Sequence, residues 1–305
     1  MCRLFGFRSI IPSQVHSSLV AADNALGRQS GRHPDGWGVA YYVDGTPHVT
    51  KSPMTALSDS IFHRLSGVVS SETVLAHVRQ ATQGTNNVLN CHPFQYGQWV
   101  GAHNGDVPNL KEFREILLAE VAPRYRRFVL GDTDSELIFF LFITELARAG
   151  SLTTVDEVGP VFEALQKTVE LVRAICDNAE NRSLLTVVVT NGRCLVALQG
   201  GKPLLFSTHK GRCPERATCG SFNEVCEAPS TTGRVNHFIV SSERLQGENV
   251  WNELGPGEAV AVDAQMRVYW ARAGATGLPV LDNKGLTELR VSRVGAPEAA
   301  VAPGP

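Results

Sequence analysis

The sequence has no hydrophobic run long enough to span a bilayer. Its most apolar stretch, LIFFLFITELA at 137–147, is too short for that and contains Glu145. The apolar start at 3–11 is interrupted by Arg8 before it reaches the length of a signal-peptide core. We therefore expect a protein without a membrane-spanning segment or a secretory leader.

The chain also has little net charge and no paired-cysteine pattern. Its 28 Lys and Arg residues nearly balance 30 Asp and Glu residues, which gives no general attraction to nucleic acid or to an anionic membrane. Seven cysteines without a disulfide framework favour a reducing, cytoplasmic location. Because a Walker loop and a glycine-rich dinucleotide motif are both missing, we expect no cofactor.

What the sequence contains is alternating blocks of strand and helix signals. Dipeptides typical of tight turns, Asp44-Gly45 and Asn191-Gly192, each stand between two apolar runs and predict hairpins. The predicted strands lie at 2–9, 36–50 (a hairpin), 73–80, 98–105, 183–199 (a hairpin), 237–242, 258–263 and 267–272. The predicted helices lie at 14–28, 109–120, 133–150 and 154–178.

Two of these helices begin with a capping box, Thr133 with Glu136 and Thr154 with Glu157. Residues 209–235 have the composition of a long loop, and disorder is expected from about 294. Strands, then helices, then strands without strict alternation predict an α+β layered fold, and no break in composition divides it.

Four short segments hold the unusual polar residues: Cys2, HVRQATQG at 77–84, HNGDV at 103–107 and GDTDSE at 131–136. Taken singly, each has an ordinary explanation. Arg79 alone is most often a surface charge, Asn104-Gly105 is a common turn, and Asp134 suits the first turn of a helix.

Together and in this order, the segments resemble the glutaminase domain of class II glutamine amidotransferases, which are N-terminal nucleophile hydrolases. RHPDGWGVAYY at 32–42 resembles the stand-alone branch, which includes the ergothioneine-pathway γ-glutamyl amidohydrolase and the glutathione-degradation amidotransferase subunit. The resemblance implies a four-layer αββα sandwich, with a glutamine amidotransferase type-2 domain at 2–275 and a C-terminal extension at 276–305.

The resemblance also assigns a nucleophile. Removal of Met1 would leave Cys2 at the terminus, with its thiol beside its own α-amine. Such an amine titrates near ~7.7–8.0, so part of it is neutral and can act as a base. The Asn104 amide and the Gly105 backbone N–H resemble the family's oxyanion hole.

The implied substrate is a γ-amide of glutamate, either glutamine or a γ-glutamyl peptide or conjugate. By the resemblance, Arg79 binds the α-carboxylate of the substrate with help from the Thr82 hydroxyl, and Asp134 binds its α-ammonium group. Gln80 and Gln83 depart from the Trp and His that some synthases carry there.

Other interpretations stay open at this stage. One is a non-catalytic or regulatory subunit of a larger amidotransferase or peptidase complex that retains the fold, and another is a self-processing hydrolase. An acceptor-domain or peptidase partner, or a homo-oligomer, is possible. A zinc site is a further alternative, with Cys213, Cys219, Cys226 and His209 as its ligands. The spacing of these cysteines matches no common zinc finger, and free thiols in a loop are the simpler interpretation. We therefore assign no metal.

Overall fold

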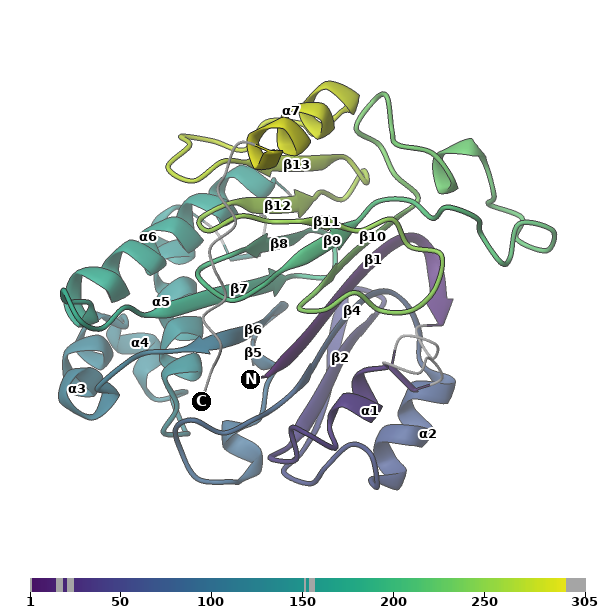
Figure 1. The fold of residues 1–305 in the computed structure, drawn as a ribbon. Helices are drawn as coiled ribbons and strands as arrows, with labels where there is room; N and C mark the ends of the chain where they lie inside the picture. The colour runs from purple at the N-terminus through teal and green to yellow at the C-terminus, as the bar shows by residue number, and fades with distance from the viewer. Residues whose placement is uncertain (1, 15–18, 21–24, 151, 154–156, 295–305) are drawn as a thin grey trace, which may run out of the picture.

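The computed structural model describes residues 2–14, 19–20, 25–150, 152–153 and 157–294. Its strands form two sheets, and all paired strands within each sheet run antiparallel (Figure 1). The seven-stranded sheet has the order β11-β9-β10-β1-β4-β2-β3, and the six-stranded sheet has the order β13-β12-β8-β7-β6-β5.

The strands are β1 (Arg3–Gln14), β2 (Trp37–Val43), β3 (Thr46–Ser52), β4 (Ser70–Val78), β5 (Phe94–Tyr96), β6 (Trp99–Asp106), β7 (Leu184–Thr190), β8 (Leu195–Leu198), β9 (Leu205–Ser207), β10 (His237–Ser241), β11 (Asn252–Glu253), β12 (Ala259–Val262) and β13 (Val268–Ala271). The helices are α1 (Leu26–Gln29), α2 (Ser60–Val68), α3 (Leu110–Glu120), α4 (Pro123–Arg126), α5 (Asp134–Arg148), α6 (Val158–Cys176) and α7 (Asn283–Val294). Short 3-10 turns lie at Val88–Asn90 and Glu224–Cys226.

The layers follow from three apolar clusters. One lies between α3, α5, α6 and the six-stranded sheet, the second lies between the two sheets, and the third lies between the seven-stranded sheet and α1 and α2. Helices therefore cover the outer face of each sheet (Figure 1). The predicted α+β class and four-layer αββα sandwich are confirmed.

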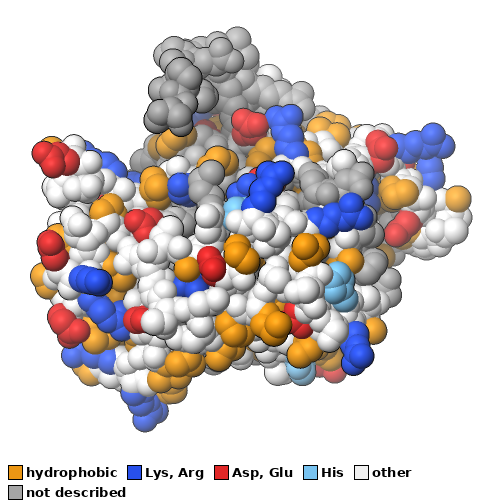
Figure 2. All heavy atoms as spheres, turned by 60° about the horizontal axis from the view of Figure 1, so that its bottom comes forward, with side chains coloured by type: hydrophobic (Ala, Val, Ile, Leu, Met, Phe, Trp, Pro, Cys, Tyr) orange, Lys and Arg blue, Asp and Glu red, His pale blue; other side chains and the backbone are white. Residues whose placement is uncertain are grey.

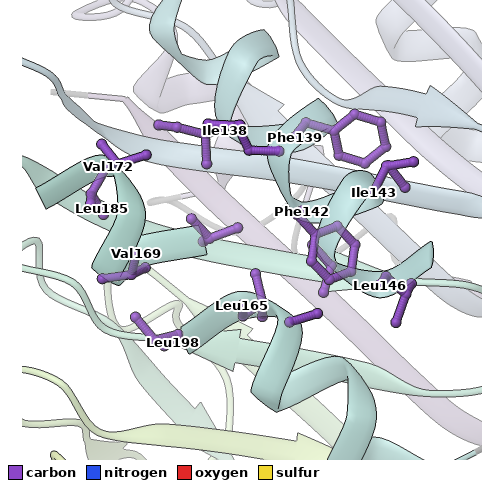
Figure 3. Close-up of a cluster of buried hydrophobic side chains, with 14 of the residues drawn as sticks. Ile138, Phe139, Phe142, Ile143, Leu146, Leu165, Val169, Val172, Leu185 and Leu198 are labelled. Atoms are coloured by element: carbon purple, nitrogen blue, oxygen red, sulfur yellow. The ribbon is translucent and has the colours of Figure 1, made fainter. Parts of the chain in front are cut away.

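The densest cluster joins α5 and α6 to the sheet beneath them. This cluster includes Phe139 and Phe142 of α5, Leu165 of α6, and Leu185 and Leu198 of β7 and β8 (Figure 3). Nearly every residue of α5 from Asp134 to Leu146 is buried, so this helix is held on all sides. Its first residue is consequently fixed in space as well as in sequence.

Residue alternation along β1 decides where Cys2 lies. Leu4 packs between the sheets, whereas Phe5 and Phe7 pack on the outer side. Cys2, two residues before Leu4, therefore lies on the inter-sheet side at the start of the strand. In β6, Val100 and Ala102 face the same inter-sheet layer, so Asn104 does too.

Most predicted elements are present, with shifted ends. Asp44 and Gly45 both have positive φ, 49° and 75°, as the tight turn between β2 and β3 requires. Thr133 accepts a hydrogen bond from the Glu136 backbone, which is one half of the predicted capping box. The Glu136 carboxylate instead accepts from the backbone of Leu130 and Gly131.

Two helix predictions need correction. The strand β1 continues to Gln14 because its far end pairs again with β4 after a register shift, so no helix starts at 14. Within 14–28 the described residues are helical at 19–20, in a π-helical turn, and in α1, and residues 15–18 and 21–24 lie outside the described residues. The helix α6 begins after Glu157, whose side chain makes no cap hydrogen bond, and Thr154 lies outside the described residues.

The C-terminal half adds a helix that sequence patterns did not predict, α7. Its Leu286 and Leu289 belong to the inter-sheet cluster, and the predicted disordered segment from 295 lies outside the described residues. Residues 209–235 contain a loop with one 3-10 turn, as expected. No helix in the described part is both long and apolar enough to cross a membrane.

Candidate active site

The Cys2 thiol sits against the backbone of Gln80, just past the end of β4. Its Sγ donates to the Gln80 carbonyl at 3.3 Å and accepts from the Gln80 N–H at 3.3 Å. Burial raises the pKa of the thiol, while the Gln80 N–H and the charge of Arg79 lower it and the charge of Asp134 raises it. The net effect is upward, so the thiol needs a base to become a nucleophile.

Arg79 is a buried cation whose hydrogen-bond partners among the described residues are neutral carbonyl groups. Its side chain is 3% exposed, and Nη2 donates to the Gln83 carbonyl at 2.7 Å. Nη1 lies 3.5 Å from the carbonyl oxygens of Asp35 and Thr85. No carboxylate pairs with Arg79 within the described ranges. Because a buried charge is costly without a counter-ion, this guanidinium is suited to take an anionic ligand.

Asp134 is the first residue of α5 and is 4% exposed. One carboxylate oxygen accepts from the Val107 N–H at 2.9 Å and the other from the Ser135 N–H at 2.7 Å. These bonds tie the helix start to the segment after β6 and hold the carboxylate in one orientation. In the part of the chain that is described, no cation pairs with it.

Asn104 and Gly105 lie inside β6, not in a turn. Asn104 is 4% exposed on the inter-sheet face. A Cβ on Gly105 would come within 1.7 Å of the Leu184 carbonyl oxygen and 2.4 Å of His103 Nε2. The end of β6 therefore has no room for a side chain at 105, and the backbone there lies tightly against β7.

Thr82 is placed differently from the other predicted binding residues. It is exposed and lines a cleft of about 680 Å³ together with Gln83, Asp106 and Arg114. The side chain of Gln83 donates to Asp106 at 3.0 Å and to the Val107 carbonyl at 2.7 Å, which closes the loop over the buried Arg79. The structure thus brings Cys2, Arg79 and Asp134 within electrostatic reach, with Thr82 on the outer wall.

Two histidines near the site are held in the scaffold. His103 Nε2 donates to the Leu184 carbonyl at 2.8 Å, and Nδ1 lies 2.8 Å from the Ser135 hydroxyl. Burial lowers the pKa of His77 to about 3, and the charges of His103 and Arg79 act in the same direction, against a backbone contact of His103 that raises it. These surroundings favour a structural role for both residues.

Sequence reasoning missed the contacts made by the segment before β2. Asp35 Oδ2 accepts from the Ala81 N–H at 2.8 Å, and His33 Nδ1 lies 3.1 Å from Gln80 Oε1. The signal was present in RHPDGWG, which the resemblance used only to choose a branch of the family.

The three cysteines of the long loop line a different cleft, of about 430 Å³, next to the far end of β1. Cys226 accepts from Asn236 at 3.0 Å, and no disulfide forms between described cysteines. Among the described residues, no group of three or more His, Cys, Asp or Glu side chains is arranged to hold a metal ion.

Comparison with known proteins gives a consistent set of similarities. Residues 1–273 match the family described as glutamine amidotransferases class-II. A probable glutamine amidotransferase of Saccharomyces cerevisiae is 30% identical over 223 residues, which cover 64% of this chain and 62% of that protein. The matched part is thus less than two thirds of that relative's length.

A second relative is the γ-glutamyl-hercynylcysteine sulfoxide hydrolase of Mycobacterium tuberculosis, 39% identical over 74 residues, which cover 24% of this chain and 32% of that protein. Among solved structures, a glutamine aminotransferase class-II domain protein of Silicibacter pomeroyi has a TM-score of 0.58 at 20% identity. It covers 90% of this chain and 100% of its own, and at that identity it shows the fold alone.

Proposed function

This chain belongs to the class II glutamine amidotransferases, and on that premise we propose that it hydrolyses a γ-glutamyl amide through a thioester on Cys2. The substrate is glutamine or a γ-glutamyl peptide or conjugate, and the reaction takes place in the cytoplasm. An acceptor or peptidase subunit can use the released amine.

The reaction needs a base for the thiol, an oxyanion hole for the substrate carbonyl and a water molecule. After removal of Met1, the neutral α-amine of Cys2 takes the thiol proton and the sulfur attacks the substrate Cδ. The Asn104 amide and the Gly105 N–H stabilise the oxyanion. The C–N bond then breaks, the amine leaves with the transferred proton, and water cleaves the thioester to release glutamate.

The observation that carries this proposal is the buried guanidinium of Arg79, which pairs with no carboxylate among the described residues and directly precedes Gln80, whose backbone contacts the thiol. A glutamate head group presents a carboxylate and an ammonium a short distance apart, and Arg79 and Asp134 offer the two opposite charges. Arg79 lowers and Asp134 raises the pKa of the Cys2 thiol, so both charges are felt at the nucleophile. The name of the mycobacterial relative supports a γ-glutamyl conjugate as one substrate class.

The proposal is tested with Cys2→Ala on processed protein whose intact mass shows that Met1 is absent. Release of glutamate is measured from glutamine, glutathione and other γ-glutamyl compounds. We expect Cys2→Ala to abolish turnover with little change in Tm, because the substitution gives up only the weak hydrogen bonds between the thiol and the Gln80 backbone. Cys219→Ala, in the distant loop, is the matched control and should keep wild-type rates. Turnover by Cys2→Ala would refute the mechanism.

A further inference from the structure

The loop between α1 and β2 is bonded to the main chain that holds the Cys2 thiol. The Asp35 N–H donates to the Arg79 carbonyl at 3.2 Å, and the Arg79 N–H donates to the Gly36 carbonyl at 2.8 Å. The Ala81 N–H donates to the Asp35 carboxylate at 2.8 Å. Residues 79 and 81 are thus fixed from this loop, and Gln80 stands between them.

His33 completes this set of contacts through a side chain. It is 5% exposed, and its Nδ1 lies 3.1 Å from Gln80 Oε1. Because an amide oxygen accepts, Nδ1 carries the proton. Burial lowers the pKa of His33, and the charges of Arg3 and Arg32 act in the same direction, against the Gln80 contact that raises it. The ring therefore stays neutral at neutral pH and keeps this tautomer.

Gln80 is consequently held at both ends. Its backbone N–H and carbonyl contact the Cys2 sulfur, and its side chain is anchored by His33. We propose that His33 is a positioning residue for the nucleophile: by anchoring the Gln80 side chain, it keeps the Gln80 peptide aligned on the Cys2 thiol. The effect of His33 on catalysis rests on the proposed function, whereas the contact between His33 and Gln80 does not.

The contact with Gln80 requires a donor at the position of His33 Nδ1, not the whole imidazole ring. His33→Asn places an amide N–H where Nδ1 lies and should keep the contact with Gln80. His33→Gln places its amide near the position of Nε2 and should lose that contact. Gln80→Ala removes the anchored side chain from the other partner. His48→Asn, at an exposed position on β3, is the matched control.

Two readouts distinguish positioning from a general loss of stability. The first is the pH midpoint for alkylation of Cys2 by iodoacetamide, followed by peptide mass spectrometry. The half-exposed Cys213 and Cys219 serve as internal references in the same molecule. The second is the separation of kcat from KM with a γ-glutamyl substrate. Because the Gln80 N–H lowers the thiol pKa, misalignment of this peptide should move the alkylation midpoint upward.

We expect His33→Gln and Gln80→Ala to raise the midpoint and to lower kcat roughly 10- to 100-fold with KM unchanged, since small misplacements of a reacting group cost this much. His33→Asn should behave like the wild type, and combining His33→Gln with Gln80→Ala should add nothing to Gln80→Ala alone.

An unchanged midpoint in His33→Gln, or equal losses in the Asn and Gln variants, would overturn the proposal. If the proposed function is wrong, Cys2→Ala retains turnover. The alkylation midpoint of Cys2 still tests the role of His33 in that case, so the two failures are distinguishable. Should His33→Gln fail to fold, the midpoint in Gln80→Ala decides, and a wild-type value there overturns the inference.

Discussion

At the scale of single residues, two buried arginines show how differently the protein treats the same charge. Arg8 is 5% exposed and pairs with Glu72 at 3.2 Å. Arg79 is 3% exposed, and within the described part of the chain it donates hydrogen bonds to carbonyl oxygens and pairs with no carboxylate. Arg8 therefore has its counter-ion within the fold, whereas Arg79 is compensated only in part, by dipoles. A ligand carboxylate would supply what is missing.

Replacing Arg79 with Lys tests this difference. Lysine keeps the charge but loses the planar fork, so it cannot grip a carboxylate through two parallel hydrogen bonds. We expect kcat/KM to fall roughly 10- to 100-fold, the equivalent of one charge-assisted hydrogen bond. Arg127→Lys, at an exposed position, should have no effect. Normal kinetics in Arg79→Lys would mean that the substrate head group binds elsewhere.

Asp134→Asn removes a charge while leaving the shape of the side chain intact. The amide oxygen of Asn can still accept from the Val107 N–H, whereas its amide nitrogen cannot accept from the Ser135 N–H, so the helix start keeps one of its two ties. Recognition of the substrate ammonium should weaken, again by roughly 10- to 100-fold in kcat/KM. Kinetics on γ-glutamyl substrates and on an analogue lacking the α-amine check this, because the analogue should not distinguish variant from wild type.

The residues of this site could be predicted from sequence better than their contacts could. The ordered motifs named Cys2, Arg79 and Asp134, and their roles stay predictions. The exposed position of Thr82 could not be foreseen, since it depends on how Gln83 folds the loop back onto the segment after β6. The His33–Gln80 contact depends on the register that sets Gly38 against His77, which no local pattern encodes.

At the scale of elements, strands with strong turn signals were predicted well, and short or context-dependent elements were not. The β2–β3 hairpin follows from Asp44-Gly45, because both residues tolerate positive φ. The continuation of β1 to Gln14 could not be predicted, because pairing with β4 resumes only after an irregularity. The helix α7 was missed because its apolar residues are few and acquire meaning only against the inter-sheet core.

The end of β6 is an element whose geometry depends on one glycine. Gly105→Ala should place a Cβ against the Leu184 carbonyl and force β6 away from β7. We expect a loss of roughly 1–3 kcal/mol in the free energy of unfolding, together with loss of turnover. Gly67→Ala in α2 is the matched control, since a Cβ there meets nothing within 4 Å.

The control variant Gly67→Ala should raise the free energy of unfolding, whereas Gly105→Ala should lower it. Alanine is favoured over glycine in a helix, so Gly67→Ala should gain up to roughly 0.5–1 kcal/mol without altering activity. Urea unfolding of both variants gives the comparison. A Gly105→Ala variant as stable and active as the wild type would show that the strand end can shift freely.

At the scale of the whole molecule, the two sheets and α7 share one apolar interior, while the surface carries mixed charge. On the face seen in Figure 2, Lys and Arg side chains are interspersed with Asp and Glu, in keeping with the net charge of −2. The proposed boundary at 275 stays a prediction. Leu281, Leu286 and Leu289, beyond that boundary, nevertheless pack in the inter-sheet cluster.

The same interior holds two histidines that link global stability to pH. His77 and His92 are 0% and 3% exposed, and their ring centroids lie 4.1 Å apart. Within the described residues, none of their four ring nitrogens has a hydrogen-bond partner. Burial, aided by the charges of neighbouring groups, lowers the pKa of His77 to about 3 and that of His92 well below its ordinary value. Both rings are therefore neutral in the folded protein at neutral pH.

Because the folded pKa values are lowered, the unfolded chain takes up protons first as the pH falls. Stability from this pair is complete above about pH 6.5, the ordinary value for histidine, and is lost progressively below it, down to the folded pKa values. Between pH 6.5 and 5 we expect the free energy of unfolding to drop by roughly 3 kcal/mol from these two groups.

Urea unfolding at closely spaced pH values measures the slope of stability against pH. The double variant His77→Gln with His92→Gln should make the slope shallower whatever its absolute stability, and the remainder comes from His237, whose pKa burial lowers to about 4. His48→Gln, which is exposed, should leave the slope unchanged. An unchanged slope in the double variant would assign the acid sensitivity to other groups, and a flat wild-type profile would mean that these rings are not held neutral by the fold.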